Sequence, residues 1–441
     1  MEFWTTNCEA VVRILFITDY LPYPPISGDL IRVYNLVRRM AENNEVSLVA
    51  VLWTPDETES LLHLRGFCHR VETGSLRWER PLACLPDLFR YAVAGKPLEL
   101  RFLYSEELAH KIGEMISEEN FDVVHIEQSR MALYLEAIPK NAHCTHVLAF
   151  QNIASDQYNR ISSIERQPIK KFRAWLYSKM MRRWEPAYAE RFDRCIAVSE
   201  QDRRQLVRSN PHLQIDLVPN GVDTQMYKPL ESGSMKTSIL FIGSMGYAPC
   251  VDAIIYFCQQ ILPRVESVLG TVEVWIVGAS PSPEVLALAN KSVHVTGQVK
   301  DVVPYYERSA ISIVPLRAGG GTRLKILEAM ALGRPVVSTS IGCEGLDVID
   351  GEQLLIADTP EKFSEGVIRL LTDKNLYQKM TADARQFVET RYDWNLIVRK
   401  LLDVYSHQVN SLRLSKNSAL GQGAINSEYL ETRHSIEIKE G

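Results

Sequence analysis

The sequence has no uninterrupted apolar run close to the roughly 20 residues that a helix needs to cross a bilayer. Its first segment, residues 1–12, carries acidic side chains where a secretory signal peptide carries basic ones. We therefore expect a cytoplasmic protein. A basic segment considered below leaves open a peripheral contact with the inner face of the cell membrane.

The 8 cysteines include no C-x-x-C pair and no Cys/His spacing typical of a zinc site. Free thiols in a reducing compartment are therefore expected, with no structural metal. An excess of basic residues is also lacking, because the formal net charge is −5, and this argues against a nucleic-acid partner. No G-x-G-x-x-G motif follows the first apolar run of either half, which disfavours a nicotinamide dehydrogenase.

What the sequence does contain is a repeated alternation of short apolar runs and helical patterns, and its 441 residues suit two domains. In the first domain, residues 12–218, strands are expected at 12–18, 45–53, 123–126, 145–150, 194–198 and 215–218, with a helix at 29–42. In the second domain, residues 237–393, strands are expected at 238–242, 272–277, 293–295, 311–314 and 336–338, with helices at 251–269, 303–309 and 322–332. This order predicts an α/β protein with two tandem Rossmann-like, doubly wound domains that face a central cleft.

The segments outside these domains have different compositions. Residues 219–236 break the periodicity with turn formers and small polar residues, which indicates a linker. A last apolar-periodic segment, 394–408, predicts a helix that packs back on the first domain. Residues 410–441 are polar and have no periodicity, so a disordered tail is expected.

The most informative stretch, residues 318–338, is predicted to be a glycine-rich loop followed by a helix and a buried strand. Its three glycines can adopt backbone angles that other residues avoid, so their N–H groups can converge on an anion at the positive end of the helix. Arg323 and Lys325 add cationic charge, and Glu328 offers a carboxylate for two neighbouring hydroxyls. Adjacent phosphate and polyol sites predict a nucleotide sugar. The alternative is an ordinary capping loop with solvated charges.

Five ordered motifs extend this pattern, at 218–223, 241–243, 277–278, 297–301 and 327–337. Together they resemble the retaining glycosyltransferases of family 4, also called group 1, over roughly residues 13–408. The resemblance is strong in the second half and weaker in the first. It implies a GT-B fold in which the second domain holds most of a nucleotide-diphosphate sugar donor and the first holds the acceptor, with no divalent metal and no other cofactor.

The resemblance also implies an activity. The chain would move a sugar to a glycan or lipid-linked glycan acceptor with retention of anomeric configuration, in the synthesis of a cell-surface polysaccharide or glycolipid. In the family's usual scheme the departing phosphate helps to deprotonate the acceptor, which attacks from the same face. Two other functions stay open: a GT-B epimerase that acts on the nucleotide sugar alone, and a non-catalytic relative that binds a nucleotide sugar or a partner glycosyltransferase.

Carried over position by position, the resemblance assigns donor binding to loops of the second domain and to one glycine loop of the first. The assigned residues are Gly28, Gly243, Ser244, Gly278, Val299, Gly319, Gly320, Gly321, Thr322, Leu324 and Glu328. No two aspartates stand two positions apart, so the D-x-D signature of metal-dependent transferases is absent. Backbone amides with Arg323 and Lys325 are then expected to neutralise the leaving diphosphate, a catalytic role through charge stabilisation.

The chain departs from the family pattern in two places. The family typically has two glutamates eight positions apart here; Glu328 fits the second, but the first position is Gly320. Sugar contacts are therefore expected from the backbone amides of 319–322. The loop at 244–250 lacks the family's arginine and lysine, so Arg323 and Lys325 are expected to carry more of the charge.

The first domain adds candidates at two strand ends. His125 and Glu127 stand where many relatives have a His-x-His pattern, and Glu127 is a candidate to orient the acceptor, accept its proton or attack the anomeric carbon. The alternatives are a surface glutamate and a structural histidine. Gln151 and Asn152 follow the next strand and are expected on the acceptor wall. Arg32 either completes the clamp on the ligand or lies on a helix surface.

Residues 164–191 form a basic amphipathic stretch in which 8 lysines and arginines alternate with aromatic and aliphatic residues. Such a helix can lie on anionic lipid, where each cation near the surface contributes about 1 kcal/mol. A domain helix with a solvated basic face explains the pattern equally well. On the membrane interpretation, the acceptor is a lipid-linked glycan.

Overall fold

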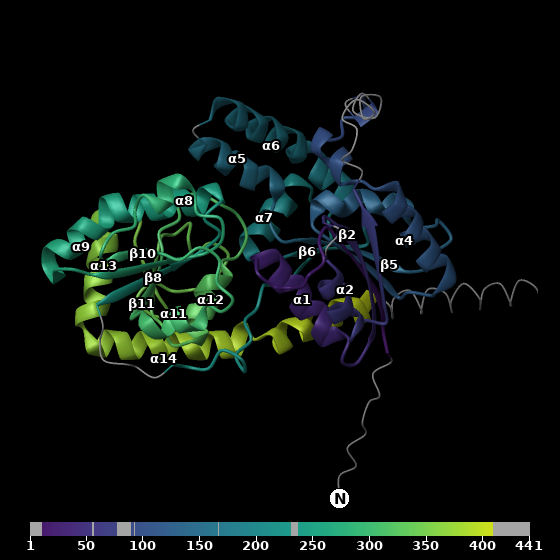
Figure 1. Cartoon of the computed structure of the whole chain (residues 1–441). Coiled ribbons are helices and arrows are strands. Elements are labelled where there is room, and N and C mark those ends of the chain that lie inside the picture. The colour runs from purple at the N-terminus through teal and green to yellow at the C-terminus, as the bar shows by residue number, and fades with distance from the viewer. Residues whose placement is uncertain are drawn as a thin grey trace, which may run out of the picture.

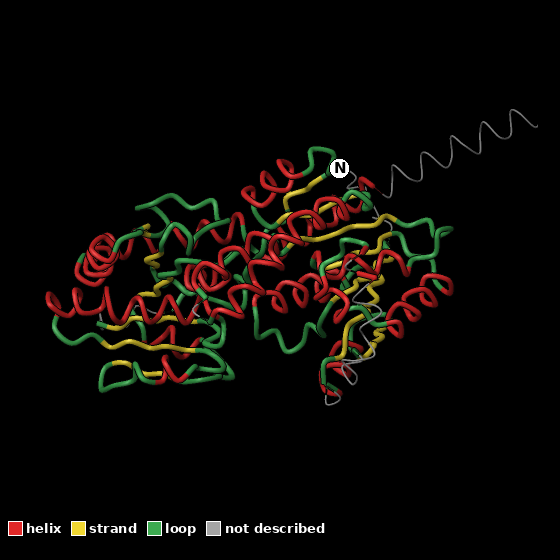
Figure 2. Tube along the Cα trace, turned by 90° about the horizontal axis from the view of Figure 1, so that it is seen from above, coloured by secondary structure: helices red, strands yellow, loops and turns green. Residues whose placement is uncertain are grey.

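The computed structural model describes residues 11–54, 57–76, 90–91, 93–165, 167–230 and 237–408. The predicted disordered tail and the end of the predicted linker, 231–236, lie outside these residues. The described chain forms two lobes, each built on a parallel β-sheet with packed helices (Figure 1). Seen from above, the strands of each lobe form their own group (Figure 2). The predicted fold class is thereby confirmed.

The first lobe contains a seven-stranded parallel sheet in the order β3-β2-β1-β4-β5-β6-β7. The strands are β1 (Arg13–Thr18), β2 (Glu45–Leu52), β3 (Arg70–Ser75), β4 (Val123–Glu127), β5 (Thr145–Phe150), β6 (Arg194–Ala197) and β7 (Ile215–Leu217). The helices are α1 (Gly28–Met40), α2 (Thr58–Arg65), α4 (Glu106–Glu118), α5 (Ala154–Ile164), α6 (Pro168–Ala189), α7 (Glu200–Ser209) and the 3₁₀ helices η2 (Leu98–Leu103) and η3 (Ser129–Ala137). The strand order reverses between β1 and β4, and ligands bind at such a switch point.

The burial of the central strand β1 explains why its sequence predicts a strand. Ile14 and Phe16 lie in one buried cluster, with residues of α1. Leu15 and Ile17 lie in a second cluster, with residues of α4 and α6. A strand buried on both faces needs an apolar run without alternation, and 14–17 provides one.

The helix at 394–408 packs on the first lobe and not on the second. Its buried side chains share the cluster that contains Ile14: they are Trp394, Ile397, Val398, Leu401 and Tyr405. Val222, after the end of the first sheet, forms a β-bridge with Asp393, just before this helix. The two segments in which the chain crosses between the lobes therefore lie side by side.

The second lobe contains a six-stranded parallel sheet in the order β10-β9-β8-β11-β12-β13. The strands are β8 (Ser238–Ile242), β9 (Glu273–Val277), β10 (Val293–Val295), β11 (Ile311–Val314), β12 (Val336–Ser338) and β13 (Leu355–Ile356). The helices are α8 (Ala248–Tyr256), α9 (Leu262–Leu269), α10 (Pro283–Leu286), α11 (Val303–Arg308), α12 (Leu324–Ala331), α13 (Pro360–Thr372) and α14 (Lys374–Arg391), with a π-helical turn η4 (Phe257–Ile261). The order reverses between β8 and β11, which marks the second switch point.

The single helix expected at 251–269 is the one element whose form differs clearly from the expectation. The structure begins it earlier, at Ala248, and interrupts it with the π turn η4 before α9. Pro263 stands in the first turn of α9 and has no N–H to donate to the preceding turn. A π turn is a usual way for a continuous helix to absorb such a mismatch.

Candidate active site between the lobes

The glycine-rich loop joins β11 to α12 at the switch point of the second sheet. Gly319 and Gly321 have φ values of +126° and +71°, which side chains rarely tolerate. A Cβ atom at Gly321 would lie 2.7 Å from the carbonyl oxygen of Gln151 in the first lobe. The loop therefore needs glycine both for its own conformation and for its contact with the facing lobe.

Arg323 lies folded against this loop. Its Nη1 donates hydrogen bonds to the carbonyl oxygens of Gly320 and Gly321. Its Nε and Nη2 are buried and have no hydrogen-bond partner among the described residues. Burial lowers the pKa of Arg323. A buried guanidinium with unused donors is poised to bind an anion.

Lys325 supplies a second buried cation from the first turn of α12. Its Nζ lies 4.0 Å from Cys250 Sγ and 4.9 Å from the centroid of the Phe241 ring. A Cβ atom at Gly243 would lie 2.9 Å from Nζ, so the ammonium sits at the carboxyl end of β8. Lys325 thus brings positive charge to the loop at 244–250, which has no cation of its own.

Glu328 lies one helical turn beyond Lys325. Burial raises the pKa of its carboxyl to about 7, although the Lys325 charge acts in the opposite direction. Nearby, Tyr306 is buried and Tyr227 is partly buried, and the pKa values of both are raised by burial first and by Glu328 second. The Tyr306 hydroxyl donates to the carbonyl oxygen of Lys325, which fixes the first turn of α12.

The remaining donor-side candidates line the strand ends of the second lobe. A Cβ atom at Gly278 would overlap the carbonyl oxygen of Gly243, at 1.6 Å, so the ends of β8 and β9 approach too closely for any side chain. Ser244 is exposed and Val299 is half-buried. Thr322 Oγ1 is buried and has no hydrogen-bond partner among the described residues.

The first lobe places three of its candidates opposite this loop. Gly28 begins α1, and a Cβ atom there would lie 3.6 Å from Leu324 Cδ1. Gln151 contacts Gly321 as described above, and a Cβ atom at Gly320 would lie 3.7 Å from Asn152 Cβ. The structure therefore brings candidates from both lobes together.

The space around Gly320 gives a physical reason for the missing glutamate. A Cβ atom at this position would lie 3.3 Å from Gln157 Cβ, tighter than an ordinary contact. Gln157 belongs to α5, and its side-chain amide lies 3.3 Å from the Tyr247 hydroxyl of the second lobe. A larger side chain at position 320 would push the lobes apart at this contact.

His125, Glu127 and Arg32 form a buried network inside the first lobe. Glu127 Oε1 lies 3.2 Å from His125 Nε2 and 3.6 Å from Arg32 Nε, and Gln151 donates to Glu127 Oε2 at 3.0 Å. Arg32 also donates to the carbonyl oxygen of Pro219. Burial alone would raise the pKa of Glu127, but the hydrogen bond with His125 and the charge of Arg32 lower it to about 2.

This network corrects two of the expected alternatives. Glu127 is not a surface glutamate and Arg32 is not on a helix surface, because their side chains are 1% and 0% exposed. His125 is also fully buried, and its Nδ1 lies 2.6 Å from the Tyr405 hydroxyl. Glu127 accepts a hydrogen bond from Gln151, which touches the glycine loop. The network therefore helps to position Gln151, and the catalytic roles expected of His125 and Glu127 stay predictions.

We expect Glu127→Gln to lower the free energy of unfolding by about 3 kcal/mol at neutral pH, because it leaves Arg32 buried without its counter-charge. The pKa of the wild-type carboxyl is about 2 in the folded protein and 4.5 for an unperturbed glutamate, so its stabilising effect is present above pH 4.5 and is lost as the pH falls towards 2. The difference between variant and wild type should therefore shrink in acid. Urea unfolding at several pH values measures it.

The matched control is Glu45→Gln, because Glu45 pairs with Arg13 on the surface. It should change stability by less than about 0.5 kcal/mol. A Glu127→Gln variant as stable as this control would show that the buried pair contributes nothing.

Sequence reasoning missed Arg160, which connects the lobes. Arg160 lies on α5, pairs with Glu344 of the second lobe, and donates to the carbonyl oxygen of Gly319 at 3.3 Å. A single charged residue on a polar helix carries no sequence signal for such a contact.

Most of the basic stretch at 164–191 is one helix, α6, which packs against α5, the helix that ends at Ile164. Tyr177, Met181 and Trp184 of α6 are buried in the first lobe. On the other side of α6, large apolar side chains are exposed: Ile169 (77%), Phe172 (59%), Trp175 (44%) and Leu176 (39%). Arg166 lies outside the described residues. Within the described ranges, none of the helices combines the length and hydropathy that a membrane crossing requires.

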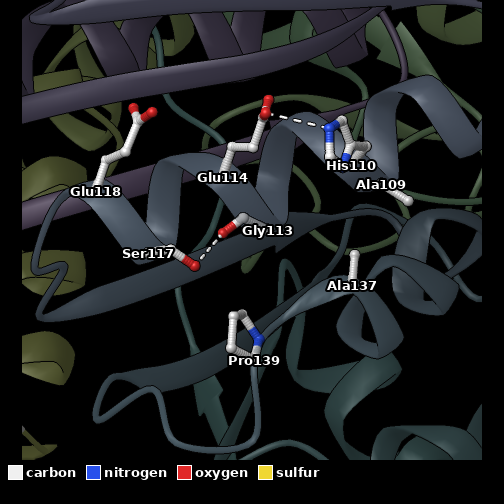
Figure 3. Close-up of a pocket in the computed structure, with 8 residues that line it drawn as sticks. All are labelled: Ala109, His110, Gly113, Glu114, Ser117, Glu118, Ala137 and Pro139. Carbon is white, nitrogen blue, oxygen red and sulfur yellow. Dashed lines mark hydrogen bonds and ion pairs between the residues drawn. The ribbon is translucent and has the colours of Figure 1, made fainter.

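Two further features bear on ligands. A cavity of about 500 Å³ lies beside α4. Figure 3 shows the residues that line it: Ala109, His110, Gly113, Glu114, Ser117, Glu118, Ala137 and Pro139. Its histidine pairs with Glu114, and it contains none of the site candidates. In the described part of the chain, no three His, Cys, Asp or Glu side chains cluster so as to hold a metal ion.

Comparisons with known proteins agree with this architecture. A family model described as "Glycosyl transferases group 1" matches residues 236–373, and one described as "Glycosyltransferase Family 4" matches residues 30–226. A D-inositol 3-phosphate glycosyltransferase of Acidothermus cellulolyticus is 26% identical over 255 residues, which are 52% of this chain and 56% of that protein. The chain spans about half the length, or less, of the curated relatives it matches.

Solved structures share the fold at low sequence identity. Sucrose-phosphate synthase from Thermosynechococcus elongatus has a TM-score of 0.66 and 16% identity, with 90% of this chain and 100% of that chain covered. Anabaena HepE in complex with UDP-glucose has a TM-score of 0.63 and 14% identity, with the same coverage. At these identities the likeness establishes the fold alone.

Proposed function

Because the chain belongs to the group 1, family 4 glycosyltransferases, we propose that it transfers a sugar from a nucleotide-diphosphate sugar to a glycan or lipid-linked glycan, with retention. The observation that carries this proposal is the pair of buried cations, Arg323 and Lys325, at a glycine-rich helix start between the lobes. Among the described residues, neither cation forms a direct ion pair, and the carboxylates that act on them electrostatically are Glu344 for Arg323 and Glu328 for Lys325. An anionic ligand is the counter-charge that this arrangement requires.

The proposed chemistry follows from where charge develops. As the bond between the anomeric carbon and the diphosphate breaks, negative charge grows on the leaving phosphate. Amides of the glycine loop, the Arg323 guanidinium and the Lys325 ammonium stabilise that charge without reorganisation. The acceptor oxygen forms its bond on the face that the diphosphate leaves, and its proton passes to the departing phosphate oxygen. These protein groups do the neutralising, and we propose no metal.

Glu328 is the proposed contact for the nucleotide ribose. Its carboxylate is buried. Among the described residues, Lys325 is the cation that acts on it electrostatically, so the carboxylate can accept hydrogen bonds from two adjacent hydroxyls. The structural neighbour bound to UDP-glucose supports a nucleotide-sugar donor for this fold.

The exposed side of α6 is the proposed contact with a membrane surface, which would bring a lipid-linked acceptor to the first lobe. Phe172 and Trp175 stack with ring centroids 5.9 Å apart and are both exposed. Lysines and arginines of the same helix surround them, and an amphipathic cationic surface of this kind binds anionic lipid.

We expect the protein to sediment with phosphatidylglycerol vesicles and much less with phosphatidylcholine vesicles. The double variant Phe172→Ser, Trp175→Ser should bind the anionic vesicles roughly tenfold more weakly, because it removes the apolar contact. Val268→Ser, Leu286→Ser is the control, since it removes exposed apolar residues of the second lobe. Equal binding by both double variants would rule out α6 as the contact.

The activity itself is tested by incubating the protein with nucleotide sugars and following release of nucleoside diphosphate. A transferase releases it faster when an acceptor is added. An epimerase would change the sugar without any acceptor, and a non-catalytic relative would bind the donor without turnover. Either result would replace the proposed function.

A further inference from the structure

We propose that the first lobe binds an uncharged sugar ring of the acceptor at the carboxyl ends of β1, β2 and β4, through Asp19, Tyr20, Trp53 and Arg130. The inference rests on the proposed function, because it names the ligand class for the acceptor side of the same cleft. None of these four residues was a candidate from the sequence.

The position of these residues is the first argument. Asp19 directly follows β1, and Arg130 lies at the start of η3, which follows β4. β1 and β4 are the neighbours between which the strand order reverses. The two side chains form an ion pair across this switch point, where doubly wound sheets bind their ligands.

The second argument is an aromatic surface held beside that ion pair. Tyr20 and Trp53 stack with ring centroids 5.0 Å apart and an interplanar angle of 15°. Trp53 Nε1 donates to the carbonyl oxygen of Asp19 at 2.6 Å, and Thr18 Oγ1 donates to that of Tyr20 at 2.8 Å. Both rings remain partly exposed. A fixed aromatic surface beside convergent polar groups suits a ligand with an apolar face and a polar rim, as a sugar ring has.

The polar groups offer both kinds of hydrogen bond. The Asp19 carboxylate accepts from sugar hydroxyls, and its side chain is 6% exposed. Arg130 Nε is buried and has no hydrogen-bond partner among the described residues. A buried donor without a partner is uncommon in folded proteins, and a ligand oxygen would satisfy it.

The charges favour a neutral ring. Asp29 lies close enough to influence both Asp19 and Arg130 electrostatically. Two carboxylates beside one guanidinium leave a net negative charge. That charge disfavours a phosphate or an acidic sugar at this position, because like charges repel.

The subsite also lies on the side of the first lobe that faces the cations. Tyr158 of α5 interacts electrostatically with Tyr20 and Arg130 in the first lobe and with Tyr247 in the second. Tyr247 in turn interacts with Arg323. Gln157, the neighbour of Tyr158 on α5, donates to the Tyr247 hydroxyl at 3.3 Å, so this part of α5 lies at the contact between the lobes.

Saturation-transfer NMR with the wild-type protein tests the proposal, using neutral methyl glycosides of glucose, galactose and mannose, and methyl glucuronide as the acidic probe. We expect transfer to at least one neutral glycoside and weaker transfer to the glucuronide. Trp53→Ala should abolish the signal, Trp53→Phe should keep part of it, and Asp19→Asn should weaken binding roughly tenfold. Trp275→Ala is the control, because it removes a ring stacked on His294 in the second lobe. It should leave the saturation-transfer signal of the glycosides unchanged.

Nucleoside-diphosphate binding by the same variants separates this inference from the proposed function. If the variants bind a diphosphate as the wild type does and lose the glycoside signal, the subsite is supported. No transfer to any neutral glycoside, an unchanged signal in folded Trp53→Ala, or a preference for the glucuronide would each overturn it. If the wild-type protein itself does not bind a nucleoside diphosphate, the proposed function is overturned instead.

Discussion

Lys325→Met is expected to lower turnover of the nucleotide sugar by about a hundredfold to a thousandfold while raising the melting temperature of the ligand-free protein. Turnover falls because one of the two cations that stabilise the leaving diphosphate is gone. Stability rises because Lys325 is a buried ammonium whose pKa burial lowers, and methionine fills the same space without a charge. Steady-state kinetics and a thermal melt measure the two effects.

The opposite direction of the two changes is what makes this variant informative. A lysine that only supports the fold would lose stability and activity together. Lys362→Met, on the exposed surface of α13, is the matched control and should change neither. Arg323→Lys should also reduce turnover, because lysine cannot donate to the loop carbonyls and to an anion from one planar group. Full turnover by Lys325→Met would remove its catalytic role.

Glu328→Gln is expected to weaken nucleoside-diphosphate binding by about tenfold to a hundredfold, since a charged acceptor for the ribose hydroxyls is lost. The effect should depend on pH. The pKa of Glu328 in the ligand-free protein is about 7, so wild-type affinity should increase between pH 6 and pH 8 as the carboxyl ionises. The variant should show a smaller increase, because only the terminal phosphate of the ligand then ionises in this range. Titration calorimetry at both pH values measures this.

Stability gives a second readout for the same variant. Because the folded pKa of Glu328 lies above the 4.5 of an unperturbed glutamate, ionising it costs stability as the pH rises through about 7. Glu328→Gln should therefore be more stabilised relative to the wild type at pH 8 than at pH 5. Glu284→Gln, at an exposed position on α10, is the control. Equal diphosphate affinity in both variants would exclude the ribose role.

The fold could be predicted from the sequence in those segments where burial requires a simple pattern of apolar residues. β1, β5 and β8 each contain an uninterrupted apolar run, as strands buried on both faces do. β3 was missed because its sequence, Arg-Val-Glu-Thr-Gly-Ser, is mostly polar, as suits a half-exposed strand at the edge of the sheet. β13 has only two residues, too few for any periodicity.

The site could be predicted where its residues are close together in the sequence. The glycines, Arg323 and Lys325 stand within a few residues of one another, so their juxtaposition follows from one loop and one helical turn. The position of Lys325 Nζ at the end of β8 could not be predicted from the sequence, because it depends on how α12 packs on the sheet.

The burial of the network around Glu127 could be recognised only from the tertiary structure. His125 is paired with Tyr405, a residue 280 positions later, and Arg32 with Pro219, 187 positions later. The Asp19–Arg130 pair has the same origin, since it forms only when β1 and β4 become neighbours. A lone charged residue in the sequence gives no sign of such a partner.

Calorimetric titration of the wild-type protein with UDP, GDP and ADP, in EDTA and again in Mg²⁺, tests most directly whether buried protein cations alone hold a diphosphate between the lobes. We predict that at least one of the three binds in EDTA, that Mg²⁺ leaves its affinity unchanged, and that Lys325→Met abolishes the binding. Binding that appears only with Mg²⁺, or no binding of any of the three, would contradict the account.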